Sequence, residues 1–332
     1  NVEGRTFVKK SRELFPRTSW GAMGIKDFDF DNDGLLDIYI TDMHSDMGGE
    51  HVKALRTNVD VAAERKKSPM PFPESILKTD GASLFGNSFF RRTAAGKFEE
   101  VSDKIGAETY WPWGLSVGDL NADGFQDVFV TSSMNFPWRY HPNHVLLNDR
   151  GQGFLFGEFV VGVEPRRGGR TAVAWHELDA SGRDKDHEFC KDRRGQYVMY
   201  GALGSRSSVL LDIDADGVLD IVPNAFNTEP LVLVSDLAEK TTVRFLKVRL
   251  KGSVSNRDGL GARVTVQAAG RRFLQVQDGQ SGYLSQSRMP LYFGLGDARV
   301  VEQVEVVWPS GLTQTLKGPL PAGQLLEIEE KK

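Results

Sequence analysis

The sequence is poor in several features that define large classes of proteins. It has one cysteine, Cys190, among 332 residues, which excludes an internal disulfide and a cysteine-rich zinc site. It contains no run of roughly 18 to 20 apolar residues, the length that a membrane-spanning helix needs. Its 41 basic and 45 acidic residues nearly balance, so no excess of positive charge indicates binding to nucleic acid.

Common catalytic motifs are also missing. We find no Gly-x-Ser-x-Gly, no His-Glu-x-x-His, no Gly-x-x-x-x-Gly-Lys and no dinucleotide-binding glycine pattern. The most reactive stretch, residues 176–200, holds His176, His187 and Cys190 without a recurrent ligand spacing, so a solvated loop is favoured over a transition-metal or thiol site. We predict no catalytic residue, and an enzyme remains the less favoured alternative.

What the sequence does contain is an aspartate-rich repeat. Three segments share the pattern Asp-x-Asp/Asn-x-Asp-Gly-x-x-Asp, and their glycines, Gly34, Gly124 and Gly217, are roughly 90 residues apart. Each segment is followed by a β-type run, such as residues 38–40 or 128–130. We therefore expect three acidic loops, each of which joins two strands.

These loops have the composition of calcium sites. Side-chain oxygens at positions 1, 3, 5 and 9 and the carbonyl at position 7 can converge on one hard cation, and the glycine at position 6 permits the turn. Without a cation, two carboxylates about 5 Å apart repel by about 3 kcal/mol at an effective dielectric near 20. We predict about three Ca²⁺ sites, with these ligands: Asp29, Asp31, Asp33, Leu35, Asp37; Asp119, Asn121, Asp123, Phe125, Asp127; Asp212, Asp214, Asp216, Val218, Asp220.

The loops are not EF-hands, because position 12 is Ile40, Val130 or Pro223 instead of a bidentate glutamate. The alternative is that they are only Asp/Asn/Gly turns between strands, which would leave the aspartate at position 9 without a reason. The second loop has an amide, Asn121, where the others have a carboxylate. We predict that it binds calcium most weakly.

Glycine-tipped segments at residues 96–98 and 151–154 indicate outer hairpins. Strand, acidic loop, strand and hairpin make four strands per unit, which is typical of a β-propeller blade of about 40 to 50 residues. The wider spacing implies insertions. We expect a short amphipathic helix over residues 50–66 and a decayed blade that begins at residues 171–184.

The acidic loops before short apolar strands resemble FG-GAP/VCBS repeats, the units of integrin-type Ca²⁺-binding propellers. The tail resembles the ASPIC/UnbV domain that follows such propellers in cartilage acidic protein and its bacterial relatives. The resemblance implies an extracytoplasmic Ca²⁺-binding or adhesion-type protein. The tail motifs that carry it are N-R-D-G-L-G-A-R-V at 256–264, G-Q-S-G-Y-L-S-Q-S at 279–287, F-G-L-G at 293–296 and V-V-W-P-S-G at 306–311.

The expected fold is all-β, with a partial propeller over residues 1–240 and a small, sandwich-like ASPIC/UnbV domain over residues 241–330. Trp308 and Phe293 are expected in the core of the tail. Strands in the tail are predicted at residues 245–250, 263–267, 273–277, 301–307 and 325–329, separated by Gly and Pro turns.

The resemblance also implies a longer propeller, because such propellers commonly have seven blades. Residues 1–240 allow roughly four blades, and the chain starts at Asn1 without an initiator methionine. We expect the C-terminal part of a propeller, whose first blade lacks strands. Its exposed edge would pair with the missing N-terminal portion or with another chain.

Aromatic inserts are the best candidates for recognising a partner. Trp111, Trp138 and Tyr140 lie near the second acidic loop in sequence and suit a sugar ring or a protein hot spot, although packing between blades is the alternative, above all for Trp113. The leading hypothesis is a secreted, periplasmic or cell-surface module that binds a protein or glycan, with structural calcium. The alternative is a polysaccharide lyase or hydrolase that uses histidine and carboxylate side chains of the inserts.

Overall fold

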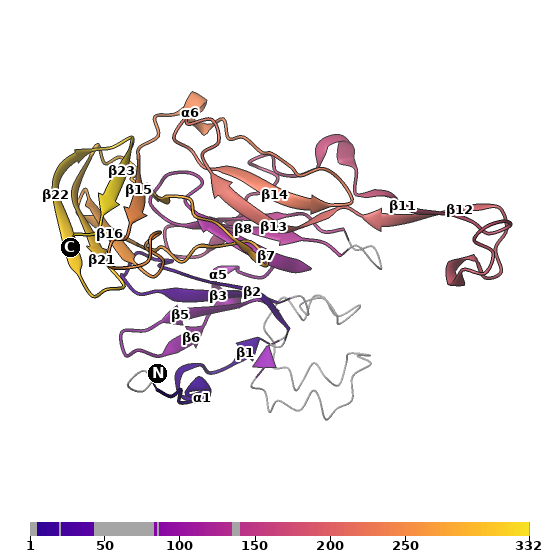
Figure 1. Ribbon diagram of the computed structural model, residues 1–332, viewed down its shortest axis with the longest axis horizontal. Coiled ribbons are helices and arrows are strands. Elements are labelled where there is room, and N and C mark those ends of the chain that lie inside the picture. Colours follow the sequence, from indigo (N-terminus) through magenta and orange to yellow (C-terminus); the bar gives the residue numbers. More distant parts are fainter. Residues whose placement is uncertain (1–4, 20, 43–82, 85, 135–139, 332) are drawn as a thin grey trace.

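The computed structural model describes residues 5–19, 21–42, 83–84, 86–134 and 140–331 (Figure 1). The helix expected over residues 50–66 and the side chain of Trp138 lie outside these residues. Three strand-rich units stand side by side, a two-stranded ribbon extends from them, and the tail covers one end (Figure 1). The chain is almost entirely β, as the sequence indicated.

Two of the units are four-stranded antiparallel meanders with the strand order of a propeller blade. In both, the acidic loop joins the first two strands and a glycine-tipped hairpin joins the last two, closed by Thr93 and Lys97 in one case and Asp149 and Gly153 in the other. The blade that starts at Ala22 has all four strands, and the expectation that the chain begins inside an incomplete blade stays a prediction. The strands are β2 (Ala22–Phe28), β3 (Asp37–Asp42), β5 (Ser88–Arg92) and β6 (Phe98–Glu100), then β7 (Pro112–Gly118), β8 (Asp127–Ser132), β9 (His144–Asn148) and β10 (Phe154–Phe156).

The third unit is smaller. Strands β13 (Gly204–Leu211) and β14 (Asp220–Phe226) pair across the third acidic loop, and an isolated bridge joins Ile221 to Leu233. The decayed blade expected from residue 171 is not a blade. Most of its residues belong to β11 (Ala172–Asp179), which among the described strands pairs with β12 (Gln196–Ala202) alone and forms with it the ribbon that extends from the body (Figure 1).

The blades are held together by apolar cores between their faces. An aromatic cluster that includes Phe30, Tyr39 and Phe89 packs against Leu146 and Phe154 of the second blade. A smaller cluster, with Phe129, Val145 and Ile221, joins the second blade to the third. Large side chains at alternate strand positions fill both cores, because successive residues of a strand point to opposite faces.

The tail is a two-sheet β domain. Its core between the sheets holds Trp308 and Phe293, both at most 2% exposed, which confirms that prediction. The five predicted tail strands are present, and β20 and β22 were not predicted. The predicted division near residue 240 stays a prediction. The sheets have the orders β20-β15-β23 and β17-β16-β21-β22, with β15 (Phe245–Lys251), β16 (Arg263–Ala268), β17 (Arg271–Val276), β20 (Leu291–Gly294), β21 (Val300–Val307), β22 (Thr313–Pro321) and β23 (Gln324–Glu329).

The remaining elements are short. Among the described residues, no helix has the length and apolar character needed to cross a membrane. The short elements are α1 (Ser11–Leu14), α5 (Ser102–Ile105), α6 (Leu237–Lys240), the 3-10 turns η2 (Arg167–Gly169) and η3 (Glu188–Cys190), the parallel pair β1 (Thr18–Ser19) and β4 (Ser83–Leu84), and the pair β18 (Gln280–Ser281) and β19 (Ser285–Gln286).

One tail segment, residues 278–287, lies against the first strands of the blades. The Gly282 N–H donates to the Leu115 carbonyl at 3.0 Å, and the Ser281 hydroxyl donates to the Ser208 carbonyl. A Cβ on Gly114 would overlap the backbone of this segment, so the approach requires glycine. The Tyr283 ring packs against Trp113 with centroids 5.3 Å apart. The segment therefore joins β7 and β13 to the tail.

Candidate metal centres

The first acidic loop is organised around Asp29, which follows the last residue of β2. Its Oδ1 accepts the Asp33 N–H and its Oδ2 accepts the Gly34 N–H, both at 3.0 Å. Gly34 has φ +86°, a conformation that favours glycine. The chain thus turns sharply and brings successive carboxylates to one side.

The three loops have the same local hydrogen bonds. In each, the position 5 aspartate accepts the N–H of position 7, as an Asx-turn does, and the position 1 carboxylate accepts the N–H of the glycine. The residues whose carbonyls were predicted as ligands are therefore held by the position 5 side chain in every loop. The Asx pairs are Asp33 with Leu35 at 2.7 Å, Asp123 with Phe125 at 2.8 Å and Asp216 with Val218 at 2.9 Å.

The aspartate at position 9 has a structural role of its own. One oxygen accepts the N–H of position 2 of the loop, and the other accepts an N–H from the next segment of the blade. These bonds close the loop and tie it to the sheet, so the residue has a reason to be there without a cation. The donors are Phe30 and Arg92 for Asp37, Leu120 and Asn148 for Asp127, and Ile213 and Ser235 for Asp220.

Burial makes these carboxyl groups hard to ionise in the absence of a cation. Burial raises the pKa of Asp29 to about 7, opposed by the hydrogen bond from Gly34 and reinforced by the neighbouring carboxylates. Burial likewise raises the pKa of Asp37 and of Asp127 to about 7, and it raises the pKa of Asp119 well above its usual range. A bound cation would favour the ionised forms.

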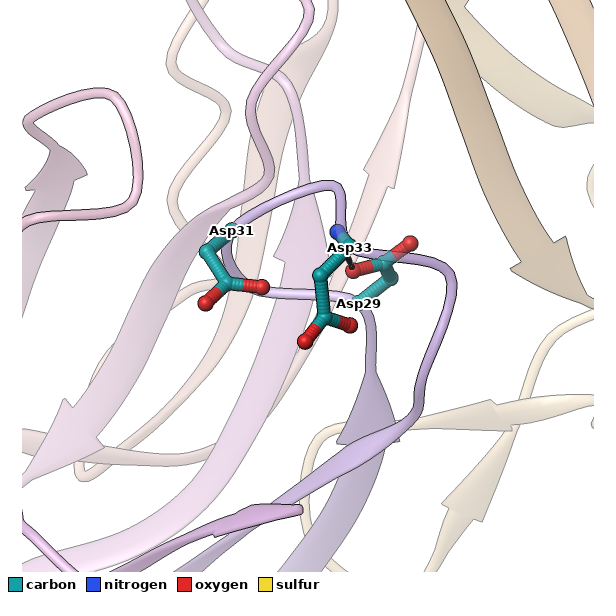
Figure 2. A group of neighbouring side chains, drawn as sticks. All are labelled: Asp29, Asp31 and Asp33. Carbon is teal, nitrogen blue, oxygen red and sulfur yellow. Dashed lines mark hydrogen bonds between the residues drawn. The ribbon is translucent and has the colours of Figure 1, made fainter. Parts of the chain in front are cut away.

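Two loops also hold a buried carboxylate oxygen that has no hydrogen-bond partner. These atoms are Oδ1 of Asp31 and Oδ1 of Asp212. In both loops the first three aspartates can offer ligand oxygens that lie within 4.8 Å of one another. Figure 2 shows Asp29, Asp31 and Asp33 gathered at one bend of the chain. A buried acceptor without a donor is costly, and a cation would satisfy it.

The donor set fits a hard cation. All predicted ligand atoms are oxygens from carboxylates, one amide or backbone carbonyls, and they come from short flexible loops, which suits Ca²⁺ better than Zn²⁺ or Mg²⁺. The second loop differs because Asn121 is exposed and its Oδ1 accepts the Asp123 N–H at 3.1 Å. The predicted ligand set and the predicted order of affinities stay predictions.

Each acidic loop also contacts a basic side chain that the sequence did not point to. The Arg91 guanidinium pairs with Asp31, and the Lys247 ammonium pairs with Asp212. At the second loop, Arg271 donates to the backbone carbonyl of Asp123 at 2.7 Å. Lys247 and Arg271 come from the tail, far along the sequence, so no local pattern could have revealed these contacts.

The aromatic candidates lie in varied surroundings. Trp111 is half-buried, and its carbonyl accepts the Ser133 N–H at 3.1 Å. Tyr140 is half-buried and donates its hydroxyl to Glu164 at 2.7 Å. Trp113 packs between blades and tail, with the Arg206 guanidinium 3.7 Å from its ring centre. The recognition role assigned to Trp111, Trp138 and Tyr140 stays a prediction.

The histidines do not gather into a metal site in the part of the chain that the structure describes. There, the groups of three or more potential His, Cys, Asp or Glu ligands are those of the first and third acidic loops. His176 packs on Trp175 with ring centres 4.5 Å apart, and His187 accepts the Phe189 N–H. His144 is 5% exposed, and its Nδ1 lies 3.2 Å from Oε1 of Glu158.

Comparison with known families identifies both halves of this architecture. Residues 252–332 match the ASPIC and UnbV family, residues 78–130 match an FG-GAP-like repeat, and residues 111–153 match an FG-GAP repeat. No curated protein matches the chain. The matched repeats include the second acidic loop, and the matched tail includes both tail sheets except β15.

Proposed function

Because this chain carries FG-GAP repeats followed by an ASPIC/UnbV domain, we propose that it is an extracytoplasmic, calcium-stabilised propeller module that binds a protein or a glycan. The observation that carries the proposal is the pair of buried, unpartnered carboxylate oxygens on Asp31 and Asp212, each in a loop of several carboxylates. Calcium has a structural role, and the module performs no catalysis of its own.

The loops lie where a bound ion can stiffen the whole molecule. The Asn32 side chain donates to the Gly124 carbonyl at 2.9 Å, which joins the first loop to the second. The Gly296 N–H donates to the Ala122 carbonyl at 2.9 Å, which joins the second loop to the tail. Ions that order these loops therefore order the contacts between blades and tail.

The proposed compartment follows from the metal. Calcium sites of extracellular modules have dissociation constants of about 10⁻⁴ to 10⁻³ M. Free calcium in the cytosol is too scarce to fill sites of that affinity, so the loops suit a protein that works outside the cytoplasm.

The ribbon of β11 and β12 is the surface best suited to a partner. A two-stranded ribbon is marginally stable by itself, and contact with another molecule would stabilise it. Its middle exposes Trp175, Val198 and Tyr200, with 37%, 37% and 51% of their surfaces accessible. Exposed aromatic side chains of this kind suit a protein hot spot or a sugar ring.

The calcium proposal is tested by a calorimetric titration with Ca²⁺, together with thermal melts in calcium, magnesium and chelator. We expect about three bound ions and a clear rise in melting temperature, since calcium at 100 times its dissociation constant stabilises by about 2.7 kcal/mol per site. Asp33→Ala and Asp216→Ala should lower the melting temperature in calcium and change it much less in chelator.

The control is Asp236→Ala, which removes an exposed aspartate outside the loops that pairs with Lys240. This variant should behave like the wild type in both conditions. Equal losses for the loop variants in calcium and in chelator would mean that the loops are only turns, and the proposal would be wrong.

A further inference from the structure

We propose that Lys247 is a resident counter-ion of the third acidic loop. Its ammonium stabilises the loop in the absence of calcium and lowers the affinity of the loop for calcium. This inference rests on the calcium binding proposed above and adds a residue that regulates it. Lys247 belongs to the tail, so the affinity of a blade loop would be set by a different domain.

The contact is direct and largely shielded from water. The Lys247 ammonium pairs with Oδ2 of Asp212, and the two side chains are 20% and 2% exposed. The same Oδ2 accepts the Gly217 N–H at 2.9 Å. Screening by solvent is weak for a pair this buried, so the positive charge acts strongly on the loop.

The other oxygen of this carboxylate is available to an ion. Oδ1 of Asp212 is buried and has no hydrogen-bond partner. Calcium bound to Oδ1 and the ammonium on Oδ2 would be two cations on one carboxylate, and they repel each other. Ammonium and calcium are therefore antagonists at this loop, although both neutralise the crowded aspartates.

The position of Lys247 is fixed by its strand. It lies in β15, the central strand of its sheet, opposite Tyr292 in β20. The Tyr292 hydroxyl donates to the Gly217 carbonyl at 2.8 Å, and the Phe245 ring would overlap a Cβ on Gly217. These two contacts hold β15 and β20 against the third loop and keep the ammonium at Asp212.

The other two loops lack this arrangement. Arg91, on Asp31, is 46% exposed and belongs to the same blade as its loop, so solvent screens it more and no other domain is involved. Arg271 comes from the tail, but it donates to a backbone carbonyl instead of a carboxylate. The third loop is therefore the one whose calcium affinity should respond to a single charge in the tail.

The test is a calorimetric Ca²⁺ titration of the full chain and of Lys247→Met. We expect the variant to bind calcium about tenfold more tightly at one site, a difference of about 1.4 kcal/mol. Lys247→Arg keeps the charge and should resemble the wild type. The matched control is Lys251→Met on the same strand, whose ammonium pairs with Glu329 of β23 at the exposed surface and not with an acidic-loop carboxylate.

The outcomes separate this inference from the proposed function. Calcium binding to the wild type with equal or weaker binding to Lys247→Met would overturn the role of Lys247 and leave the calcium proposal intact. No binding to either protein would overturn both. Asp212→Asn provides a further check, because Lys247→Met should no longer tighten binding in that background.

Thermal melts give a second readout that a merely structural contact would not reproduce. In chelator, Lys247→Met should melt below the wild type, because the loop has lost the ammonium that pairs with Asp212. In calcium the difference in melting temperature between the two proteins should vanish or reverse. A variant that folds only in calcium would support the same role for Lys247. An equal loss in both conditions would show that Lys247 simply packs, contrary to the proposal.

Discussion

Asp29 and Asp37 are carboxyl groups whose surroundings disfavour their own charge. Both are at most 2% exposed, and burial raises the pKa of each to about 7. They nevertheless accept backbone hydrogen bonds that shape the loop. An apolar residue at either position could not accept these bonds, and the turn would be lost. At the scale of single residues, the chain keeps its loop geometry at the expense of electrostatic strain.

This strain predicts how stability depends on pH. A folded pKa of about 7 against an ordinary value of 3.8 means that the folded state binds more protons between about pH 4 and pH 7. The free energy of unfolding in chelator should therefore fall as pH rises through that window, by up to about 1.4 kcal/mol per pH unit for each carboxyl group, and level off above it. Urea unfolding at several pH values measures the slope.

Asp29→Asn should make this slope shallower, because one of the titrating groups is gone. In saturating calcium the trend should reverse, with stability rising with pH as protons stop competing for the ligands. A free energy of unfolding in chelator that rises between pH 4 and pH 7 would contradict the prediction.

The ribbon of β11 and β12 extends from the body as a separate two-stranded sheet with a small core of its own (Figure 1). A small cluster of Leu178, Cys190 and Met199 with its neighbours packs the tip, separately from the cores between the blades. The ends of the ribbon, Ala172 and Ala202, pair with each other. The blades therefore do not need the ribbon to bridge any gap in the chain.

Replacing residues 173–201 by a short Gly/Ser linker should leave the calcium-bound melting temperature within about 3 °C of the wild type, since few contacts are lost and loop length has a small entropic effect. Calcium stoichiometry should not change. Differential scanning calorimetry checks both proteins. A large drop would mean that the ribbon is part of the core fold, and binding to a glycan array by the wild type alone would assign the ribbon a recognition role.

The elements that sequence reasoning predicted are those specified by neighbouring residues. Each acidic loop, its flanking strands and each glycine-tipped hairpin is encoded within about 20 residues, so local patterns were sufficient. Strand β22 was missed because Gly318, Pro319 and Pro321 within it indicate turns. The ribbon was misread as a blade because its Asp- and Gly-containing tip resembles an acidic loop.

The contacts that no local pattern could predict are those that unite the molecule. The Lys26 ammonium pairs with Asp278 at 2.5 Å, and these side chains are 14% and 17% exposed. They join the first blade to the tail across most of the chain. Lys247 and Arg271 connect the tail to the third and second loops. The relative positions of blades and tail thus depend on charged side chains whose partners lie in distant segments.

A double-mutant cycle on Lys26→Met and Asp278→Asn should measure the coupling energy between the first blade and the tail at this ion pair. We expect a coupling energy of about 1–2 kcal/mol and a single unfolding transition in urea, because the pair is largely shielded from solvent and bridges two units. The exposed pair Lys251 and Glu329 serves as the reference and should couple by less than about 1 kcal/mol. A coupling no larger than the reference would mean that the blade and tail are joined without help from this pair.

The segment at residues 278–287 has a consequence for synthesis of the protein. It seats on β7 and β13, yet the ribosome makes it after all three blades have emerged. A nascent chain that ends before residue 278 presents the serines of β7 and β13, and the surface around Gly114, to the surrounding solvent. The contact that joins β7 and β13 to the tail can therefore form only after residue 287 has been synthesised, so this joint is made later than the cores between the blades.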